Sequence, residues 1–269
     1  MKVVDIKNVT KVYDETEVEV HAVNGISLDF DEGEFAAIVG PSGSGKTTLL
    51  NMLGGLDNST SGEITINDIS ISELFNRIQW KKKKFHKAVE IIMKITIIPK
   101  ILQFIFTLPK RMKRSKAERK IVDFRLNNIG FVFQSYNLIP VLTAKENVEF
   151  IMHLQGVEKS KRDQRVKELL DAVGLGDRLD SRPKQLSGGQ QQRVAVARAL
   201  ASKPKFILAD EPTANLDSKS TENLLEIMEK LNKEENITFI FSTHDARVVK
   251  KARRVITVED GMVVSDEKK

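Results

Sequence analysis

A glycine-rich octapeptide that ends in Lys-Thr is the strongest chemical signal in the sequence. Residues 40–47 read G-x-x-x-x-G-K-T, and an apolar run, residues 35–39, directly precedes them. A triphosphate must be met by several backbone N–H groups at once, and glycine permits that close approach because it has no side chain. A helix that begins near Lys46 adds free N–H groups and the positive end of its dipole. We therefore predict a nucleoside triphosphate site in which Lys46 reaches the β- and γ-phosphates and the Thr47 hydroxyl ligates Mg²⁺. The predicted phosphate-binding residues are Gly40, Pro41, Ser42, Gly43, Ser44, Gly45, Lys46, Thr47 and Thr48.

Four polar residues that directly follow apolar, strand-like runs are candidates for the chemistry of hydrolysis. Asp210 and Glu211 are adjacent and diverge, so Asp210 can bind Mg²⁺ through water while Glu211 acts as general base on the attacking water. The Gln134 amide can contact Mg²⁺ or the attacking water, and it can thereby sense whether the γ-phosphate is present. His244 can hydrogen-bond the γ-phosphate or orient Glu211.

A second glycine-rich turn precedes a predicted helix far along the chain. Residues 186–190 read Leu-Ser-Gly-Gly-Gln, and the helix beginning at Gly188 makes this turn a second candidate anion site. Two phosphate-binding faces on one chain suggest that two chains share each nucleotide, head to tail.

The elements that must position these residues alternate between strands and helices. This alternation predicts an α/β core with parallel strands and with the phosphate loop at their carboxyl edge. The predicted strands include residues 26–30, 35–39, 63–66, 129–133, 206–209 and 238–242, with a hairpin over 255–264. The predicted helices are residues 46–53, 143–155, 160–173, 188–201 and 218–233.

The composition excludes several classes of protein. The 269 residues contain no cysteine, so neither a disulfide framework nor a thiolate metal site exists. The N-terminus lacks the apolar core of a signal peptide, so we expect a cytoplasmic location. The net charge of +6 is concentrated in one block, which argues against a nucleic-acid partner.

Together, these motifs resemble the ATP-binding cassette of ABC transporters. The resemblance rests on the phosphate loop, Gln134, Leu186–Gln190, Phe206–Glu211, Ala214–Asp217 and His244, in that order. It covers residues 1–269 except for a basic insertion at 76–125. It implies a P-loop NTPase fold with a RecA-like mixed sheet core, an antiparallel β subdomain and an α-helical signature subdomain at residues 141–200.

The resemblance also implies roles for individual residues and for ATP and Mg²⁺. Tyr13 corresponds to the aromatic residue that stacks on adenine, Gln134 to the Q-loop glutamine, His244 to the switch histidine and Asp217 to the D-loop aspartate. Thr47, Gln134 and Asp210 would hold Mg²⁺. The γ-phosphate bound by the other protomer would meet Ser187, Gly188, Gly189 and Gln190.

Residues 49–57 and 129–140 further resemble the lipoprotein-releasing and macrolide-export ATPases, which serve FtsX-like permeases. We therefore expect a homodimer of cassettes beneath a separate integral membrane permease, peripheral on the inner face of the cell membrane. Two alternatives stay open: an FtsE-like regulatory ATPase and a soluble ABC ATPase. The transported substrate is not readable from the cassette.

The insertion at residues 76–125 departs from the family pattern. It carries 16 Lys or Arg residues and three acids, or +13, so the rest of the chain carries −7. Its apolar centre, residues 88–108, is long enough to span a bilayer. However, Lys94 and Lys100 would each cost about 3 kcal/mol, which cancels the gain from a dozen apolar residues at about 0.5 kcal/mol each. A single span would also separate Lys46 from Gln134.

We therefore expect two short amphipathic helices, kinked near Pro99, that lie on an acidic membrane surface. In one alternative, the apolar face packs on the cassette or the permease. In the other, the segment has no fixed structure in the isolated subunit.

Overall fold

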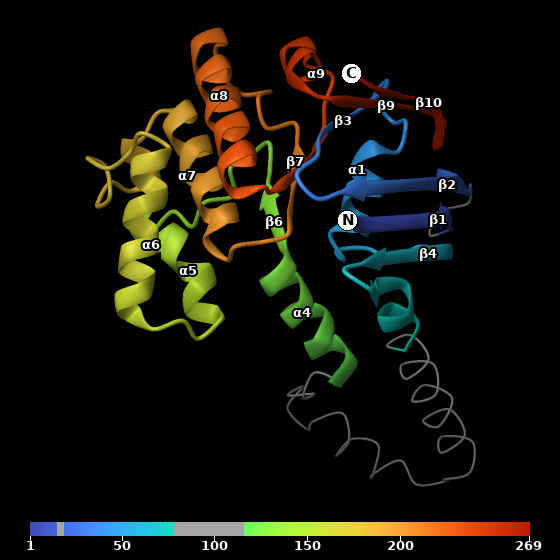
Figure 1. Cartoon of the computed structure of the whole chain (residues 1–269), viewed down its shortest axis with the longest axis horizontal. Helices are drawn as coiled ribbons and strands as arrows, with labels where there is room; N and C mark the ends of the chain where they lie inside the picture. The colour runs from blue at the N-terminus through green and yellow to red at the C-terminus, as the bar shows by residue number, and fades with distance from the viewer. Residues whose placement is uncertain (15–18, 78–115) are drawn as a thin grey trace, which may run out of the picture.

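The computed structural model describes residues 1–14, 19–77 and 116–269, and Figure 1 shows their arrangement. Its strands are β1 (Lys2–Tyr13), β2 (Val20–Asp31), β3 (Phe35–Val39), β4 (Ser61–Ile66), β5 (Ile69–Ser70), β6 (Ile129–Val132), β7 (Phe206–Asp210), β8 (Thr238–Ser242), β9 (Arg254–Glu259) and β10 (Met262–Lys268). Its helices are α1 (Lys46–Leu53), α4 (Lys116–Asn128), α5 (Ala144–Leu154), α6 (Lys159–Ala172), the 3₁₀ turn η1 (Pro183–Gln185), α7 (Gly188–Ala201), α8 (Ser218–Glu235) and α9 (Ala246–Lys251).

A six-stranded mixed sheet forms the centre of the molecule. Its strand order is β10-β9-β3-β8-β7-β6, in which every neighbouring pair is parallel except β9 and β10. The strands β3, β7 and β8 are short apolar runs because both faces of the sheet are covered. The predicted α/β fold with parallel strands is confirmed.

Alternate residues of the central strands supply two separate cores. Phe35 and Ala37 of β3 pack with α5, α6, α7 and α8, whereas Ala36 and Ile38 pack with α1 and the strands β1, β2 and β4. This division follows from the two-residue period of a strand, which points successive side chains to opposite faces. Helices α7 and α1 therefore lie on opposite faces of the sheet (Figure 1).

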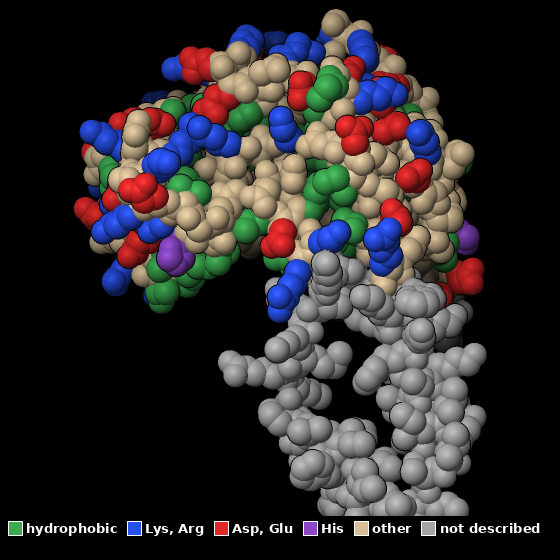
Figure 2. Space-filling model, turned by 60° about the horizontal axis from the view of Figure 1, so that its bottom comes forward, with side chains coloured by type: hydrophobic (Ala, Val, Ile, Leu, Met, Phe, Trp, Pro, Cys, Tyr) green, Lys and Arg blue, Asp and Glu red, His purple; other side chains and the backbone are tan. Residues whose placement is uncertain are grey.

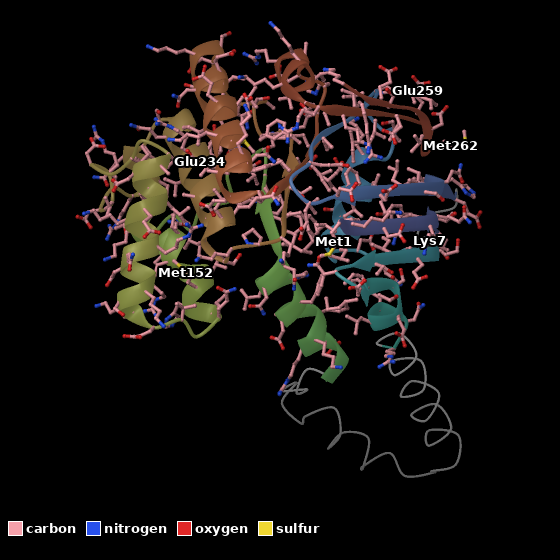
Figure 3. The ribbon with its side chains drawn as sticks, in the orientation of Figure 1. Met1, Lys7, Met152, Glu234, Glu259 and Met262 are labelled. Carbon is pink, nitrogen blue, oxygen red and sulfur yellow. The ribbon has the colours of Figure 1, made fainter. Side chains whose placement is uncertain are left out.

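The second sheet is antiparallel, with the order β2-β1-β4-β5. It lies on the α1 side, and Figure 3 shows Lys7 of β1 far from Met152 of the helical layer. β1 and β2 are each 12 residues long, longer than the alternation in the sequence indicated, and their register shifts at several points. Tyr13, expected at a loop edge, is the last residue of β1.

Helices α5 and α6, and α7 except for its last residue, lie in residues 141–200, the predicted helical subdomain. Thr143 caps α5: its hydroxyl accepts from the Glu146 N–H while the Glu146 carboxylate accepts from the Thr143 N–H. This capping box was predicted from the spacing of the two residues, because each satisfies a backbone group that the first turn leaves free.

Of the predicted insertion, the structure describes residues 76, 77 and 116–125. α4 continues to Asn128 and packs on β6 through Phe124 and Ile129. The predicted amphipathic helices, the lipid contact and their alternatives fall on residues outside the described part. Within that part, no helix is both long and apolar enough to cross a bilayer. Figure 2 shows acidic and basic side chains interspersed over the described surface seen in that view.

Candidate functional site

The phosphate loop between β3 and α1 encloses the Lys46 ammonium. Lys46 is buried, and its Nζ donates to the carbonyl oxygens of Gly40 at 2.9 Å and Pro41 at 2.7 Å. Gly45 caps α1 with φ 99°, and a Cβ there would lie 2.1 Å from the Ala22 carbonyl oxygen. No acidic side chain lies in the first turn of α1, and no side chain caps it. The first-turn N–H groups are therefore arranged to meet an anion.

Two of the three predicted magnesium ligands, one at the start of α1 and one at the end of β7, face one another. The Thr47 hydroxyl at the start of α1 donates to the Asp210 carboxylate at the end of β7, at 3.2 Å. Among residues 1–14, 19–77 and 116–269, no cluster of three or more His, Cys, Asp or Glu side chains is placed to hold a metal. A hydroxyl, a carboxylate and phosphate oxygens are nevertheless hard ligands that suit Mg²⁺, which uses few protein ligands of its own. Gln134, the third predicted ligand, is exposed, and its backbone carbonyl oxygen accepts from the Asn215 side-chain amide at 3.0 Å.

Glu211 is held at both carboxylate oxygens. His244 Nδ1 lies 2.7 Å from one oxygen, and the Thr243 hydroxyl donates to the other at 3.2 Å. The Glu211 side chain is 18% exposed, whereas that of His244 is 75% exposed and can still meet a ligand. The backbone of Glu211 is left-handed, with φ 45°, and its N–H donates to the Ser242 carbonyl. The predicted contact between His244 and Glu211 is therefore present.

The second glycine-rich turn caps α7. The Ser187 hydroxyl accepts from the Gln190 N–H at 3.3 Å, and the Gln190 side-chain oxygen accepts from the Ser187 N–H at 2.8 Å. A Cβ at Gly188 would lie 2.8 Å from the Tyr136 hydroxyl, and one at Gly189 would lie 2.8 Å from the Ser220 hydroxyl. The turn begins α7, which lies on the opposite face of the sheet from α1, the helix that the phosphate loop begins.

Tyr13 is fixed by two residues that the sequence analysis did not find. Its hydroxyl donates to Asp57 at 2.7 Å, and Lys11 donates to the other Asp57 oxygen at 2.7 Å. The Lys11 ammonium also lies 4.6 Å from the centre of the Tyr13 ring. Burial opposes ionisation of Asp57, but the hydrogen bonds from Lys11 and Tyr13 together hold its pKa below the ordinary value. Lys11 could have been found, since it lies two residues from Tyr13 on the same strand face; Asp57 gave no local signal.

Asp245, next to His244, was also missed. It accepts from the Thr213 hydroxyl at 2.8 Å and forms a bidentate pair with Arg247, which lowers its pKa to about 2. Asp217, the predicted D-loop aspartate, caps α8 by accepting from the Ser220 N–H. The Thr213–Asp245 hydrogen bond thus joins the segment after Glu211 to the segment after β8, and Asp217 joins the same segment to the start of α8.

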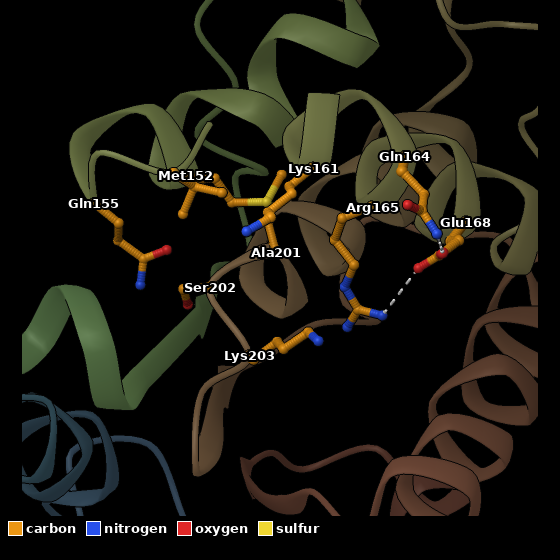
Figure 4. Close-up of a pocket in the computed structure, with 10 residues that line it drawn as sticks. Met152, Gln155, Lys161, Gln164, Arg165, Glu168, Ala201, Ser202 and Lys203 are labelled. Atoms are coloured by element: carbon orange, nitrogen blue, oxygen red, sulfur yellow. Dashed lines mark hydrogen bonds and ion pairs between the residues drawn. The ribbon is translucent and has the colours of Figure 1, made fainter. Parts of the chain in front are cut away.

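A cavity of about 340 Å³ lies apart from these residues, between α5, α6 and the C-terminal end of α7. Lys161, Arg165 and Lys203 line it, and Figure 4 shows Arg165 directed toward Glu168. None of the predicted nucleotide-binding residues lines this cavity, so the candidate site is the loop and strand edge described above.

Comparisons with known proteins agree with this geometry. Residues 23–102 and 108–214 match the family model for the ABC transporter. The chain is 42% identical over 268 residues to an uncharacterized ABC transporter ATP-binding protein of Thermotoga maritima, covering 100% of this chain and 96% of that protein. It is 39% identical over 269 residues to the macrolide export ATP-binding/permease protein MacB of Aggregatibacter actinomycetemcomitans, covering all of this chain but only 35% of MacB.

A solved structure is also similar to the whole chain. It is the dimeric structure of a post-hydrolysis state of the ATP-binding cassette MJ0796 bound to ADP and Pi. The two structures superpose with a TM-score of 0.75 at 38% sequence identity, over 98% of each chain.

Proposed function

Since the chain belongs to the ABC transporter family and is an ATPase of that family, we propose that it works as a dimer of cassettes that drives a separate, FtsX-like membrane permease. One observation carries the proposal for the site. The Thr47–Asp210 contact and the Glu211–His244 contact converge at the carboxyl ends of β7 and β8, beside the phosphate loop. A metal-binding pair and an oriented carboxylate at one sheet edge are what in-line attack of water on a γ-phosphate requires.

Each residue then has a defined task. Lys46 and the first-turn N–H groups of α1 would hold the β- and γ-phosphates, while Thr47, Asp210 and Gln134 would hold Mg²⁺. When bound, Mg²⁺ would neutralise charge on the phosphate oxygens. Glu211 takes a proton from the attacking water, and the new P–O bond forms as the bond to ADP breaks. His244 and Thr243 keep the Glu211 carboxylate aimed at the water, because each occupies one of its oxygens.

A second chain completes the site. Ser187, Gly188, Gly189 and Gln190 of one protomer would cover the γ-phosphate held by its partner. The placement of α7 and α1 on opposite faces of the sheet supports this arrangement. The dimeric form of the similar cassette MJ0796 also supports it.

The membrane partner is proposed from the relatives. In MacB, a region similar to this whole chain makes up about a third of an ATP-binding/permease protein. A cassette on a chain of its own would meet an equivalent permease at the inner face of the membrane. An FtsE-like role, in which the cassette transmits a signal without moving a substrate, would use the same ATP chemistry.

The Glu211→Gln variant tests the hydrolytic core of the proposal. It should bind ATP normally and lose turnover by about 10²-fold or more, because a removed general base typically costs 10²–10⁴-fold. ATP should also trap this variant as a dimer, measured by light scattering after size-exclusion chromatography. Glu226→Gln, at an exposed position of α8, is the matched control and should hydrolyse ATP like the wild type. Unchanged turnover of Glu211→Gln would remove Glu211 as the base.

A pulldown of the membrane-expressed chain tests the partner. An FtsX-like permease should co-purify with the full chain. Recovery of no membrane protein would contradict the permease proposal and favour a soluble ATPase.

A further inference from the structure

The side chain of Gln192, on α7, is fully buried and joins three segments of the chain. Its amide nitrogen donates to the Pro212 carbonyl at 2.8 Å and to the Phe133 carbonyl at 3.3 Å. Phe133 directly precedes Gln134, and Pro212 directly follows Glu211. One side chain of the helix that begins at the Leu186–Gln190 turn thus holds the backbone beside two residues of the proposed reaction.

This arrangement has an energetic cost. The side-chain oxygen of Gln192 is buried and has no hydrogen-bond partner within the described part of the chain. A buried polar atom without a partner costs about 1–3 kcal/mol. The two hydrogen bonds that the amide nitrogen donates offset this cost, and they satisfy carbonyl oxygens of two different strand ends.

Helix α7 makes a second set of hydrogen bonds to this part of the chain, just after Gln134. Arg198, six residues beyond Gln192, donates to the carbonyl oxygens of Tyr136 at 2.9 Å and Asn137 at 2.5 Å. Both acceptor residues have left-handed backbones, with φ 58° and 51°. Non-glycine residues adopt this conformation at a cost, so surrounding contacts must maintain it. Residues 133–137 are therefore held to α7 at both ends.

We propose that Gln192 is a positioning residue for ATP hydrolysis: it fixes Gln134 and Glu211 relative to each other and to the Leu186–Gln190 end of α7. The inference rests on the proposed function and deepens it. The Gln192 side chain is fully buried. It acts through the backbone on either side of the site, so that a displacement of α7 moves both reacting residues together.

The Gln192→Met variant tests this inference, because methionine has a similar length but cannot donate to either carbonyl. ATP affinity should stay within about twofold, since the phosphate loop is untouched. The kcat should fall on the order of 10- to 100-fold, as expected for a misplacement of reacting groups by about 1 Å. Amide hydrogen exchange of residues 134–137 should also become faster. The kcat and the amide exchange should both be measured well below the melting temperature of the variant.

Gln155→Met is the matched control. The Gln155 amide also joins a helix to a distant backbone, donating to the Leu126 carbonyl at 3.2 Å, but away from the proposed site. Its kcat should match that of the wild type. If Gln192→Met does not fold, Gln192→Leu serves instead, because leucine fills part of the same buried space and cannot donate to either carbonyl.

Three outcomes separate the hypotheses. A folded Gln192 variant with a kcat within twofold of the wild type overturns the inference. A variant with a lower melting temperature but normal kcat and normal exchange at residues 134–137 also overturns it, since Gln192 would then be structural only. If Glu211→Gln still hydrolyses ATP, the proposed function fails first, whatever Gln192 does.

Discussion

Replacement of Tyr13 by alanine should weaken ATP binding without slowing the chemical step. The Lys11 ammonium lies over the Tyr13 ring and the Tyr13 hydroxyl donates to Asp57, and these contacts fix the ring that we expect to stack on adenine. Stacking of a base on an aromatic ring is worth about 1–3 kcal/mol by alanine substitution. Since about 1.4 kcal/mol is tenfold in affinity, the Kd for ATP should rise roughly 5- to 150-fold. The kcat at saturating ATP should change little, because the phosphate loop and Glu211 are unaltered.

Titration calorimetry with two ligands makes this experiment specific. Inorganic triphosphate carries the phosphates but no base, so Tyr13→Ala should bind it as the wild type does. Tyr13→Phe keeps the ring and loses only the bond to Asp57, so its effect on ATP should be smaller than that of Tyr13→Ala. The reasoning fails if Tyr13→Ala binds ATP within twofold of the wild type. It also fails if ATP and triphosphate are weakened equally.

Three further changes test other parts of the structure. Arg247 lowers the pKa of Asp245 to about 2, and a lowered pKa stabilises the fold above about pH 4, a contribution that is lost as the pH falls toward 2. Asp245→Asn should therefore melt below the wild type near pH 6, with the gap narrowing below about pH 4 and closing toward pH 2; a constant gap would contradict this. Arg254 is 5% exposed and bridges two carboxylates, so Arg254→Met should lower the free energy of unfolding, measured in urea, by about 3–5 kcal/mol. The matched control, the exposed Arg178→Met, should lower it by less than about 0.5 kcal/mol. A loss under about 1 kcal/mol for Arg254→Met would show that the bridge adds little to stability. Ser187→Arg should bind ATP as a monomer yet fail to hydrolyse it, and phosphate release equal to the wild type would exclude a role for this turn.

Local patterns predicted the central elements closely. Residues 46–53, 188–201 and 238–242 form α1, α7 and β8 with the expected bounds. These elements are marked by short-range signals: a glycine turn before each of the two helices and an uninterrupted apolar run for the buried strand. The hairpin at Asp260 and Gly261 was predicted for the same reason, because its turn residues are adjacent in sequence.

The contacts that hold the site together could not be predicted in this way. Asp57 lies 44 residues from Tyr13, and Gln192 lies 59 residues from Phe133. No periodicity links such pairs, since they meet only after the strands have taken their order in the sheet. The left-handed backbone of Glu211 could not be predicted from the sequence either, because glutamate has no local preference for that conformation. Sequence patterns predicted candidate reacting side chains and the contact between His244 and Glu211, whereas the contacts made by Asp57, Thr243 and Gln192 emerged only from the tertiary structure.

The separation of the two glycine-rich turns by the central sheet has a consequence for kinetics. In the proposed dimer, the phosphate loop of one chain is completed by the Ser187–Gln190 turn of the other. Turnover per chain should therefore rise with protein concentration, and the rate should be second order in enzyme when the chain is dilute. Within a membrane complex the two cassettes would be held at a high local concentration, so the rate would become first order. If the proposed dimer is correct, the enzyme would be slow when it is free and active when it is assembled.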